Sequence, residues 1–195
     1  MDRLHPNFKM TEMTKEQFFY AYKELAKTAE QHVLLESGRA GKLCIAGIDP
    51  LVTLTSKQSR SLELTWRDGT KEVREGEPLE LLSAFVQSMK MDNVPGVPDF
   101  QGGVIGFISY DYARTYEPIP DTAVDDLETP DIFFCLFDRW AVLDLETEEV
   151  YFMTLPGRGL DVSEVEREWV EAAEVGLSKR IHLPADRIID YARPE

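Results

Sequence analysis

The sequence predicts an α+β fold in which antiparallel β-sheets pack against a few helices. Strand-like runs outnumber helical patterns along the chain, and most of these runs are joined by turns of hairpin length. The length of 195 residues suits one domain with a substantial core, and 43% apolar residues is typical of globular proteins. We expect a leader over residues 1–13, a single domain over 14–177 and a linker-like tail over 178–195.

Three segments have the spacing of amphipathic helices, with apolar residues recurring at intervals of three and four. Thr14 begins the first helix, because Thr-x-x-Gln is the pattern of a capping box. Pro78 suits the first position of the second helix, where the N–H that proline lacks would have no partner. The third helix covers 161–177, with Asp161 or Ser163 as its cap.

Strands are expected where short apolar or alternating runs are bounded by turn residues. Asp68-Gly69 lies between two alternating runs and is a strong signal for a β-hairpin. Asp49-Pro50 interrupts an apolar run, so we expect a bend there. The acidic segment 121–131 is expected to be an exposed loop. The expected strands cover residues 32–37, 42–48, 51–54, 61–67, 70–74, 103–108, 132–137, 140–145 and 150–155.

The most specific stretch covers residues 98–120 and reads PDFQGGVIGFISYDYARTYEPIP. Its first half has no charge from Phe100 to Tyr110, which predicts a strand buried on both faces. Glycines weaken a strand unless something approaches its backbone, so we expect close packing there. Residues 111 and 114 are three apart and can pair on one helical face. The residues that carry this structural motif are Gly102, Gly103, Gly106, Tyr110, Asp111 and Arg114.

Charge and composition limit the class of partner. Thirty-six acidic residues against 21 basic ones give a net charge of −15, which disfavours nucleic acid and anionic membranes as partners. No apolar run reaches the roughly 20 residues of a membrane span, and we find no signal peptide. Cys44 and Cys135 lie in apolar runs and are expected to be reduced thiols of a cytoplasmic protein. We expect no metal site, catalytic residue or cofactor in this chain, since its three histidines lack metal-ligand spacing.

A second polar cluster lies at a turn between two apolar strands. Glu36 and Ser37 end the first strand, and Lys42 begins the second, followed by Leu43 and Cys44. A carboxylate and an ammonium beside an apolar wall suit a zwitterionic amino acid, with Glu36 meeting its ammonium and Lys42 its carboxylate. The alternative is a capped strand end with a surface ion pair.

Together the two segments resemble the N-terminal region of component I of chorismate-utilising enzymes, namely aminodeoxychorismate (para-aminobenzoate) synthase and anthranilate synthase. The similarity covers residues 14–175 and rests on LLES, the glycine turn with its basic residue, and FQGGVIGFISYDYAR with Glu117-Pro118. It implies the N-terminal half of the chorismate-enzyme fold, linked to a C-terminal domain that holds chorismate, Mg2+ and the catalytic residues. It also implies a glutamine amidotransferase subunit as the partner that supplies ammonia.

The resemblance further implies a tryptophan pocket, which is inhibitory in the anthranilate enzymes and often structural in the aminodeoxychorismate enzymes. Ser37 matches the serine of the pocket motif, with Glu36 beside it and residues 42–44 on the second pocket strand. The family commonly has Arg-Tyr-Ser where this chain has Lys-Leu-Cys, so the aromatic ring and the hydroxyl that favour tryptophan are missing. Residues 100–103 favour the aminodeoxychorismate branch, which serves folate biosynthesis.

We therefore expect a non-catalytic region of aminodeoxychorismate synthase component I, inactive alone, whose whole enzyme converts chorismate to 4-amino-4-deoxychorismate. The first alternative is the same region of anthranilate synthase component I, in tryptophan biosynthesis. From a different class, the alternatives are a stand-alone amino-acid sensor and an interaction module without a ligand.

Overall fold

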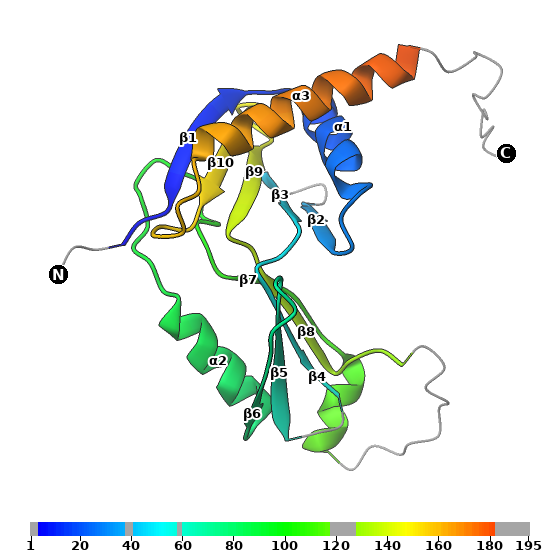
Figure 1. The fold of residues 1–195 in the computed structure, drawn as a ribbon, viewed down its shortest axis with the longest axis vertical. Coiled ribbons are helices and arrows are strands. Elements are labelled where there is room, and N and C mark those ends of the chain that lie inside the picture. The colour runs from blue at the N-terminus through cyan, green and yellow to red at the C-terminus, as the bar shows by residue number, and fades with distance from the viewer. Residues whose placement is uncertain (1–3, 38–40, 58–59, 118–127, 182–195) are drawn as a thin grey trace, which may run out of the picture.

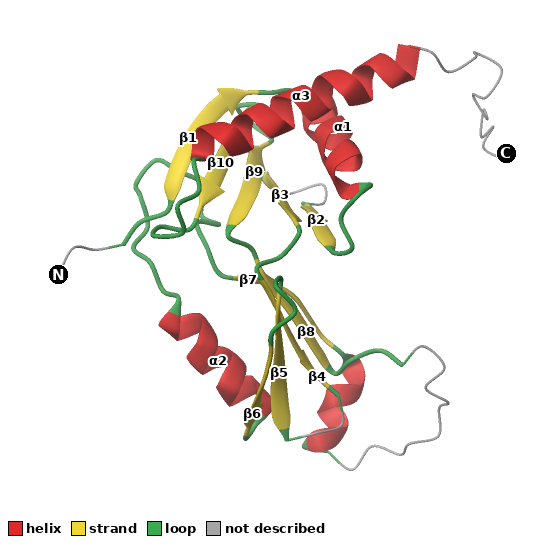
Figure 2. Cartoon of the chain, viewed as in Figure 1, coloured by secondary structure: helices red, strands yellow, loops and turns green. Residues whose placement is uncertain are grey.

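The computed structural model describes residues 4–37, 41–57, 60–117 and 128–181. Within these residues the chain forms two five-stranded antiparallel sheets and three α-helices (Figure 1). Figure 2 shows the strands in two separate groups, with α1 and α3 over the first group and α2 beside the second. The expected α+β class with antiparallel sheets is confirmed.

The first sheet, which we call sheet A, has the strand order β1-β10-β9-β3-β2. Every neighbouring pair is antiparallel, so side chains that lie opposite each other share a face. One face carries α1 and α3 (Figure 1). The strands are β1 (Asn7–Glu12), β2 (His32–Glu36), β3 (Leu43–Ile48), β9 (Arg139–Asp144) and β10 (Glu149–Thr154).

The two helices over sheet A begin where the sequence predicts. Thr14 and Gln17 form the expected reciprocal capping box. Asp161, one of the two expected caps, accepts a hydrogen bond from the backbone N–H of Ser163 at 2.8 Å. The helices are α1 (Lys15–Ala26) and α3 (Val162–Ile181).

Aromatic contacts join both helices to each other and to sheet A. The ring of Phe18 on α1 stacks on Trp169 of α3 with centroids 5.1 Å apart, and Phe152 of β10 lies 5.9 Å from the same indole. All three rings are buried. Because burial of one such side chain contributes on the order of 2 to 3 kcal/mol, this cluster fixes the helices on the sheet.

The second sheet, sheet B, has the strand order β6-β5-β4-β8-β7. The expected Asp68-Gly69 turn joins β5 to β6, and Gly69 has the positive φ of 86° that such turns require. Pro78 is the first residue of α2 (Pro78–Ser88), as predicted, and η1 (Tyr110–Thr115) follows β7 as a 3-10 helix. The strands are β4 (Val52–Ser56), β5 (Ser61–Trp66), β6 (Lys71–Glu75), β7 (Val104–Ile108) and β8 (Ile132–Leu136).

Two expectations about the ends of the domain are wrong. Residues 7–12, which were expected in the leader, form β1 and pair with β10 along their whole length. Their sequence NFKMTE alternates apolar and polar residues with the period of a strand. Residues 178–181, which were expected in the tail, continue α3. The rest of that tail, and residues 121–127 of the acidic segment, lie outside the described residues.

Strand β7 is not buried on both faces, contrary to the prediction. It is an edge strand of sheet B, and Phe107 and Ile108 are 43% and 47% exposed. An uncharged run indicates that a strand has apolar surroundings. It does not show which elements cover each face of the strand. The expected close approach at Gly106 is confirmed, because a Cβ there would lie 1.9 Å from the backbone oxygen of Phe133 on β8. The approach is between neighbouring strands, whereas the close packing expected at Gly103 is wrong, since apart from its chain neighbours no atom of the described residues lies within 4 Å of a Cβ there.

The chain passes between the two sheets twice among the described strands. Residues 49–51 join β3 to β4, and residues 137–138 join β8 to β9. These two crossovers lie side by side, since the backbone N–H of Leu51 donates to the backbone oxygen of Leu136 at 2.8 Å. The bend expected at Asp49-Pro50 is therefore the place where the chain changes sheets.

We predict that Gly106→Val lowers the free energy of unfolding by about 2 to 4 kcal/mol, because the new side chain would force β7 away from β8. Strand propensity alone predicts the opposite sign, since valine is favoured in strands and glycine is not. Urea unfolding followed by circular dichroism measures the change. Ile108→Val on the same strand is the control and should shift stability by less than about 1 kcal/mol. A Gly106→Val variant at least as stable as the parent would contradict the close approach.

Candidate functional site

The residues expected to form an amino-acid pocket lie at one end of the β2–β3 hairpin. Glu36 lies opposite Cys44 in the register, and the backbone N–H of Ser37 donates to the backbone oxygen of Leu43 at 3.2 Å. Leu43 and Cys44 point to opposite faces of sheet A, as neighbours in a strand do. Cys44 is fully buried beneath the helices, whereas Leu43 packs against the apolar cluster that extends to sheet B. The expected pocket residues therefore do not all line one surface.

The two charged groups of this hairpin have partners elsewhere in the chain. Lys15 of α1 pairs with Glu36 at 2.6 Å, and this hydrogen bond raises the pKa of Lys15. Lys42 pairs with Glu146, in the turn between β9 and β10, at 3.0 Å. All four side chains are between 47% and 67% exposed, so these are weak surface pairs.

The residues before β7 close a loop against sheet A. Gln101, which is 5% exposed, accepts from the backbone N–H of Val94 at 2.6 Å and donates to the backbone oxygens of Val94 and Val97 at 2.9 and 3.2 Å. The indole N–H of Trp140 donates to the backbone oxygen of Phe100 at 3.4 Å. The sequence did not predict this role of Gln101, for which the available signal is a polar residue at the start of an uncharged run.

The other motif residues serve the backbone and a short ion pair. Gly102 and Gly103 have φ values of 153° and 114°, which side chains rarely permit. Asp111 pairs with Arg114 at 3.1 Å within η1, as predicted. Tyr110 is 84% exposed.

Two further tyrosines of this motif hold the start of α2. The phenols of Tyr112 and Tyr116 both donate to the carboxylate of Glu77, the N-cap of α2, the second of them at 2.7 Å. Burial raises the pKa of Tyr112, so its phenol stays protonated and remains a donor at neutral pH. The aromatic residues after β7 thus anchor a helix that lies far from them in the sequence.

A pocket of about 540 Å3 opens between the end of α1, the face of α3 and the end of sheet A at which the inner strand β3 ends and β9 begins. Apolar side chains from three elements line it, among them Leu25, Ala46, Ile48 and Val165. It lies at the opposite end of β3 from Lys42. The sequence does not predict this pocket, because the residues that form its walls come from segments far apart in the chain.

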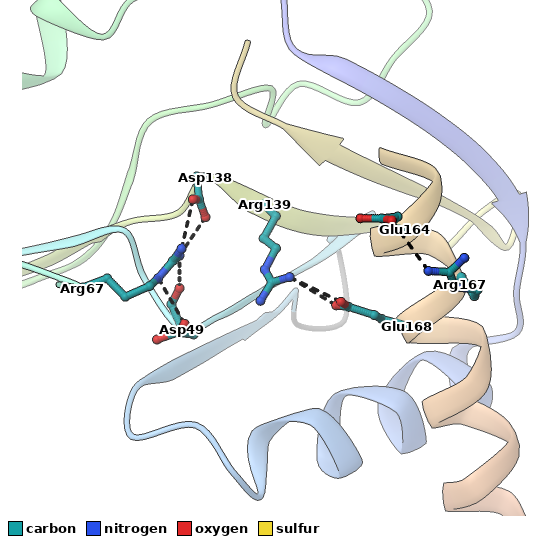
Figure 3. Close-up of polar contacts among 7 residues, drawn as sticks. All are labelled: Asp49, Arg67, Asp138, Arg139, Glu164, Arg167 and Glu168. Carbon is teal, nitrogen blue, oxygen red and sulfur yellow. Dashed lines mark hydrogen bonds and ion pairs between the residues drawn. The ribbon is translucent and has the colours of Figure 1, made fainter. Parts of the chain in front are cut away.

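One charged pair at this pocket joins sheet A to α3. Arg139, the first residue of β9, directs its Nη1 to the two carboxylate oxygens of Glu168 at 3.3 and 3.5 Å (Figure 3). Both side chains are partly exposed, at 34% and 47%. A separate pair, Arg167 with Glu164 at 3.8 Å, lies on α3 outside the pocket lining, and each side chain is 64% exposed.

A second charged cluster, which we call the sheet clamp, consists of Arg67, Asp49 and Asp138. The guanidinium of Arg67 donates to both carboxylate oxygens of Asp138 at 2.7 and 3.1 Å (Figure 3). It also contacts Asp49, at 3.1 Å to a carboxylate oxygen and 2.5 Å to the backbone oxygen. The hydrogen bond to Asp138 raises the pKa of Arg67 despite partial burial. Each aspartate belongs to one crossover, so a single side chain holds both.

Metal ligands and thiols are the remaining candidates for chemistry among the described residues. Among them, no group of three or more His, Cys, Asp or Glu side chains is placed to hold a metal ion. Cys44 and Cys135 are free thiols, and burial raises the pKa of Cys135 to about 11. In the part of the chain that the structure covers, no helix is long and apolar enough to cross a bilayer.

Comparison with curated proteins finds relatives along most of the chain. Aminodeoxychorismate synthase component 1 of Bacillus subtilis (strain 168) is 36% identical over 177 residues, which cover 87% of this chain. Anthranilate synthase component 1 of Thermus thermophilus is 30% identical over 88% of the chain. This chain is a homologue of component I of the aminodeoxychorismate and anthranilate synthases. It spans 37% and 36% of the length of these two relatives, and no family model matches it.

The fold agrees with this homology. The crystal structure of anthranilate synthase component I from Streptococcus pneumoniae TIGR4 superimposes with a TM-score of 0.51 at 21% sequence identity. The superposition covers 82% of this component I homologue and 34% of the solved chain. The expected chorismate-enzyme fold is therefore confirmed for the part that the chain spans.

We predict that Asp138→Asn lowers the free energy of unfolding by about 2 kcal/mol, because Arg67 loses its charged, largely buried acceptor. Asparagine has nearly the same shape, so the loss reports charge and hydrogen bonding. Glu164→Gln, in the exposed pair on α3, is the matched control and should cost less than about 0.5 kcal/mol. Equal effects of the two substitutions in denaturant unfolding would show that the sheet clamp does not stabilise the fold.

Proposed function

We propose that this chain is a non-catalytic region of an aminodeoxychorismate synthase component I. The observation that carries the proposal is the 36% identity to the Bacillus subtilis protein of that name over 87% of the chain, against 29% and 30% for two anthranilate synthase components. The aminodeoxychorismate synthase component 1 of Salmonella typhimurium, at 35% identity over 57% of the chain, supports the same branch. The alternative is the corresponding region of an anthranilate synthase component I, which many of the relatives carry in their names.

In this proposal the region packs against a chorismate-binding, Mg2+-dependent domain that performs the chemistry. Exposed apolar side chains on three edge strands of the two sheets support such a role, because exposed apolar surface commonly marks an interface. These side chains are 40% to 47% exposed and lie on β1, β2 and β7: Phe8, Met10, Leu35, Phe107 and Ile108. A glutamine amidotransferase subunit would supply ammonia to the whole cytoplasmic enzyme, which would form 4-amino-4-deoxychorismate for para-aminobenzoate and folate synthesis.

We predict that the purified chain forms no product from chorismate, ammonia and Mg2+, since the proposal assigns the reaction to another domain. Mixing it with the part of the Bacillus subtilis relative that it does not match should yield 4-amino-4-deoxychorismate, measured by chromatography. That part alone is the control and should be less active than the mixture. Product from the chain alone would overturn the non-catalytic role, and anthranilate from the mixture would favour the alternative branch.

The tryptophan pocket remains part of the proposal, with Ser37 at its centre. We predict that the isolated chain binds L-tryptophan no tighter than about 1 mM, near −4 kcal/mol. Glu36 and Lys42 already pair with other side chains, and one wall would bury too little of the ligand to offset the lost translational freedom. Calorimetry measures the affinity, which should rise when the catalytic part is added and should not rise with Ser37→Ala. Micromolar binding by the chain alone would favour a stand-alone sensor.

A further inference from the structure

We infer that the pocket between α1, α3 and the end of strands β3 and β9 of sheet A binds a small monocarboxylate with an apolar body. The inference concerns a different end of sheet A from the hairpin of Glu36 and Lys42, and it does not depend on the proposed function. At about 540 Å3 the pocket falls in the usual range for small-molecule sites. Its apolar wall, formed by Leu25, Ile48 and Val165, suits a hydrocarbon body.

Arg139 supplies unused hydrogen-bond donors to this pocket. Its contacts to Glu168 run through Nη1 alone, and both are long, at 3.3 and 3.5 Å. Within the described residues, its Nε and Nη2 groups therefore have no acceptor. Arg67, the other arginine at the pocket, differs because each of its three guanidinium nitrogens contacts Asp49 or Asp138.

Trp169 supplies a second unused donor. The residue is 4% exposed and lines the pocket, and its indole N–H donates to no acceptor in the described part of the chain. No fully buried side-chain nitrogen or oxygen among the described residues lacks a partner. The indole nitrogen therefore keeps some accessible surface, and Trp169 is one of the residues that line the pocket.

The chemistry of these groups defines the ligand. The unused donors of Arg139 and Trp169 require a ligand that presents acceptors, and a guanidinium prefers a carboxylate to a neutral oxygen. The other charges at the pocket limit the ligand to one negative charge. Asp49 is held by Arg67, whereas Glu30 and Glu168 would repel a dianion such as phosphate. A carboxylate bound at Nε and Nη2 of Arg139 would share the guanidinium with Glu168, which makes Glu168 a competitor for the same positive charge.

The experiment titrates the 195-residue chain with phenylacetate and, as the neutral match, phenylacetamide, with binding followed by ligand-observed NMR. We expect phenylacetate to bind at least about fivefold more tightly than the amide. Arg139→Gln should weaken phenylacetate binding at least about tenfold, and Trp169→Phe should weaken it about threefold while keeping the aromatic packing. Glu168→Gln should tighten binding, because it removes the competitor. Arg167→Gln, in the exposed pair on the same helix, is the matched control and should change nothing.

Several results would overturn the site. These are no saturable binding of phenylacetate, equal binding of acid and amide, unchanged binding by Arg139→Gln, and weaker binding by Glu168→Gln. Circular dichroism checks that each variant folds. If Arg139→Gln does not fold, the change in phenylacetate affinity caused by Glu168→Gln decides whether the ligand binds at Arg139: tighter binding supports the site and weaker binding overturns it. Ser37→Ala must leave phenylacetate binding unchanged, because a loss would move the ligand to the β2–β3 hairpin and overturn the assignment.

Discussion

The arrangement of the two sheets depends on the contact of one guanidinium with two crossovers. Arg67 follows β5 of sheet B, while Asp49 and Asp138 lie in the segments where the chain leaves and re-enters sheet A. A planar guanidinium can donate to several acceptors in fixed directions, whereas a lysine ammonium would act as a point charge. The side chain of Asp138 is only 6% exposed, so water competes little for it. The sheet clamp therefore holds together the two crossovers from which both sheets extend.

Elements with local signals could be predicted from the sequence. The capping box at Thr14, the turn at Asp68-Gly69 and the helix start at Pro78 each depend on residues within four positions of one another, and all three are confirmed. The pair between Asp111 and Arg114 belongs to the same class. For the cap, the turn and the helix start, the physical constraint is an unsatisfied backbone group or a fixed φ. The type of residue at that position meets the constraint without help from distant segments.

Features that depend on contacts between distant segments could not be predicted. The predicted strand at β7 was right, but its burial was wrong, because burial depends on what else covers the sheet. At the β2–β3 hairpin, Glu36 and Lys42 were expected to face one ligand, whereas Lys15 and Glu146 reach them from other elements. The pocket beside Arg139 has no signal in any one segment, since its apolar wall and its donors come from helices and strands that meet only in the fold.

The position of the two crossovers means that sheet B is an insertion in sheet A. The insertion runs from residue 50 to residue 137, and its two ends meet where Leu51 donates to Leu136. A short linker between Asp49 and Asp138 would therefore close sheet A without stretching the chain. The excised sheet would not stand alone, however, because the cluster that includes Trp140 on β9 is shared with sheet B. The topology makes the two sheets separable as chain segments, whereas the shared core favours their unfolding together.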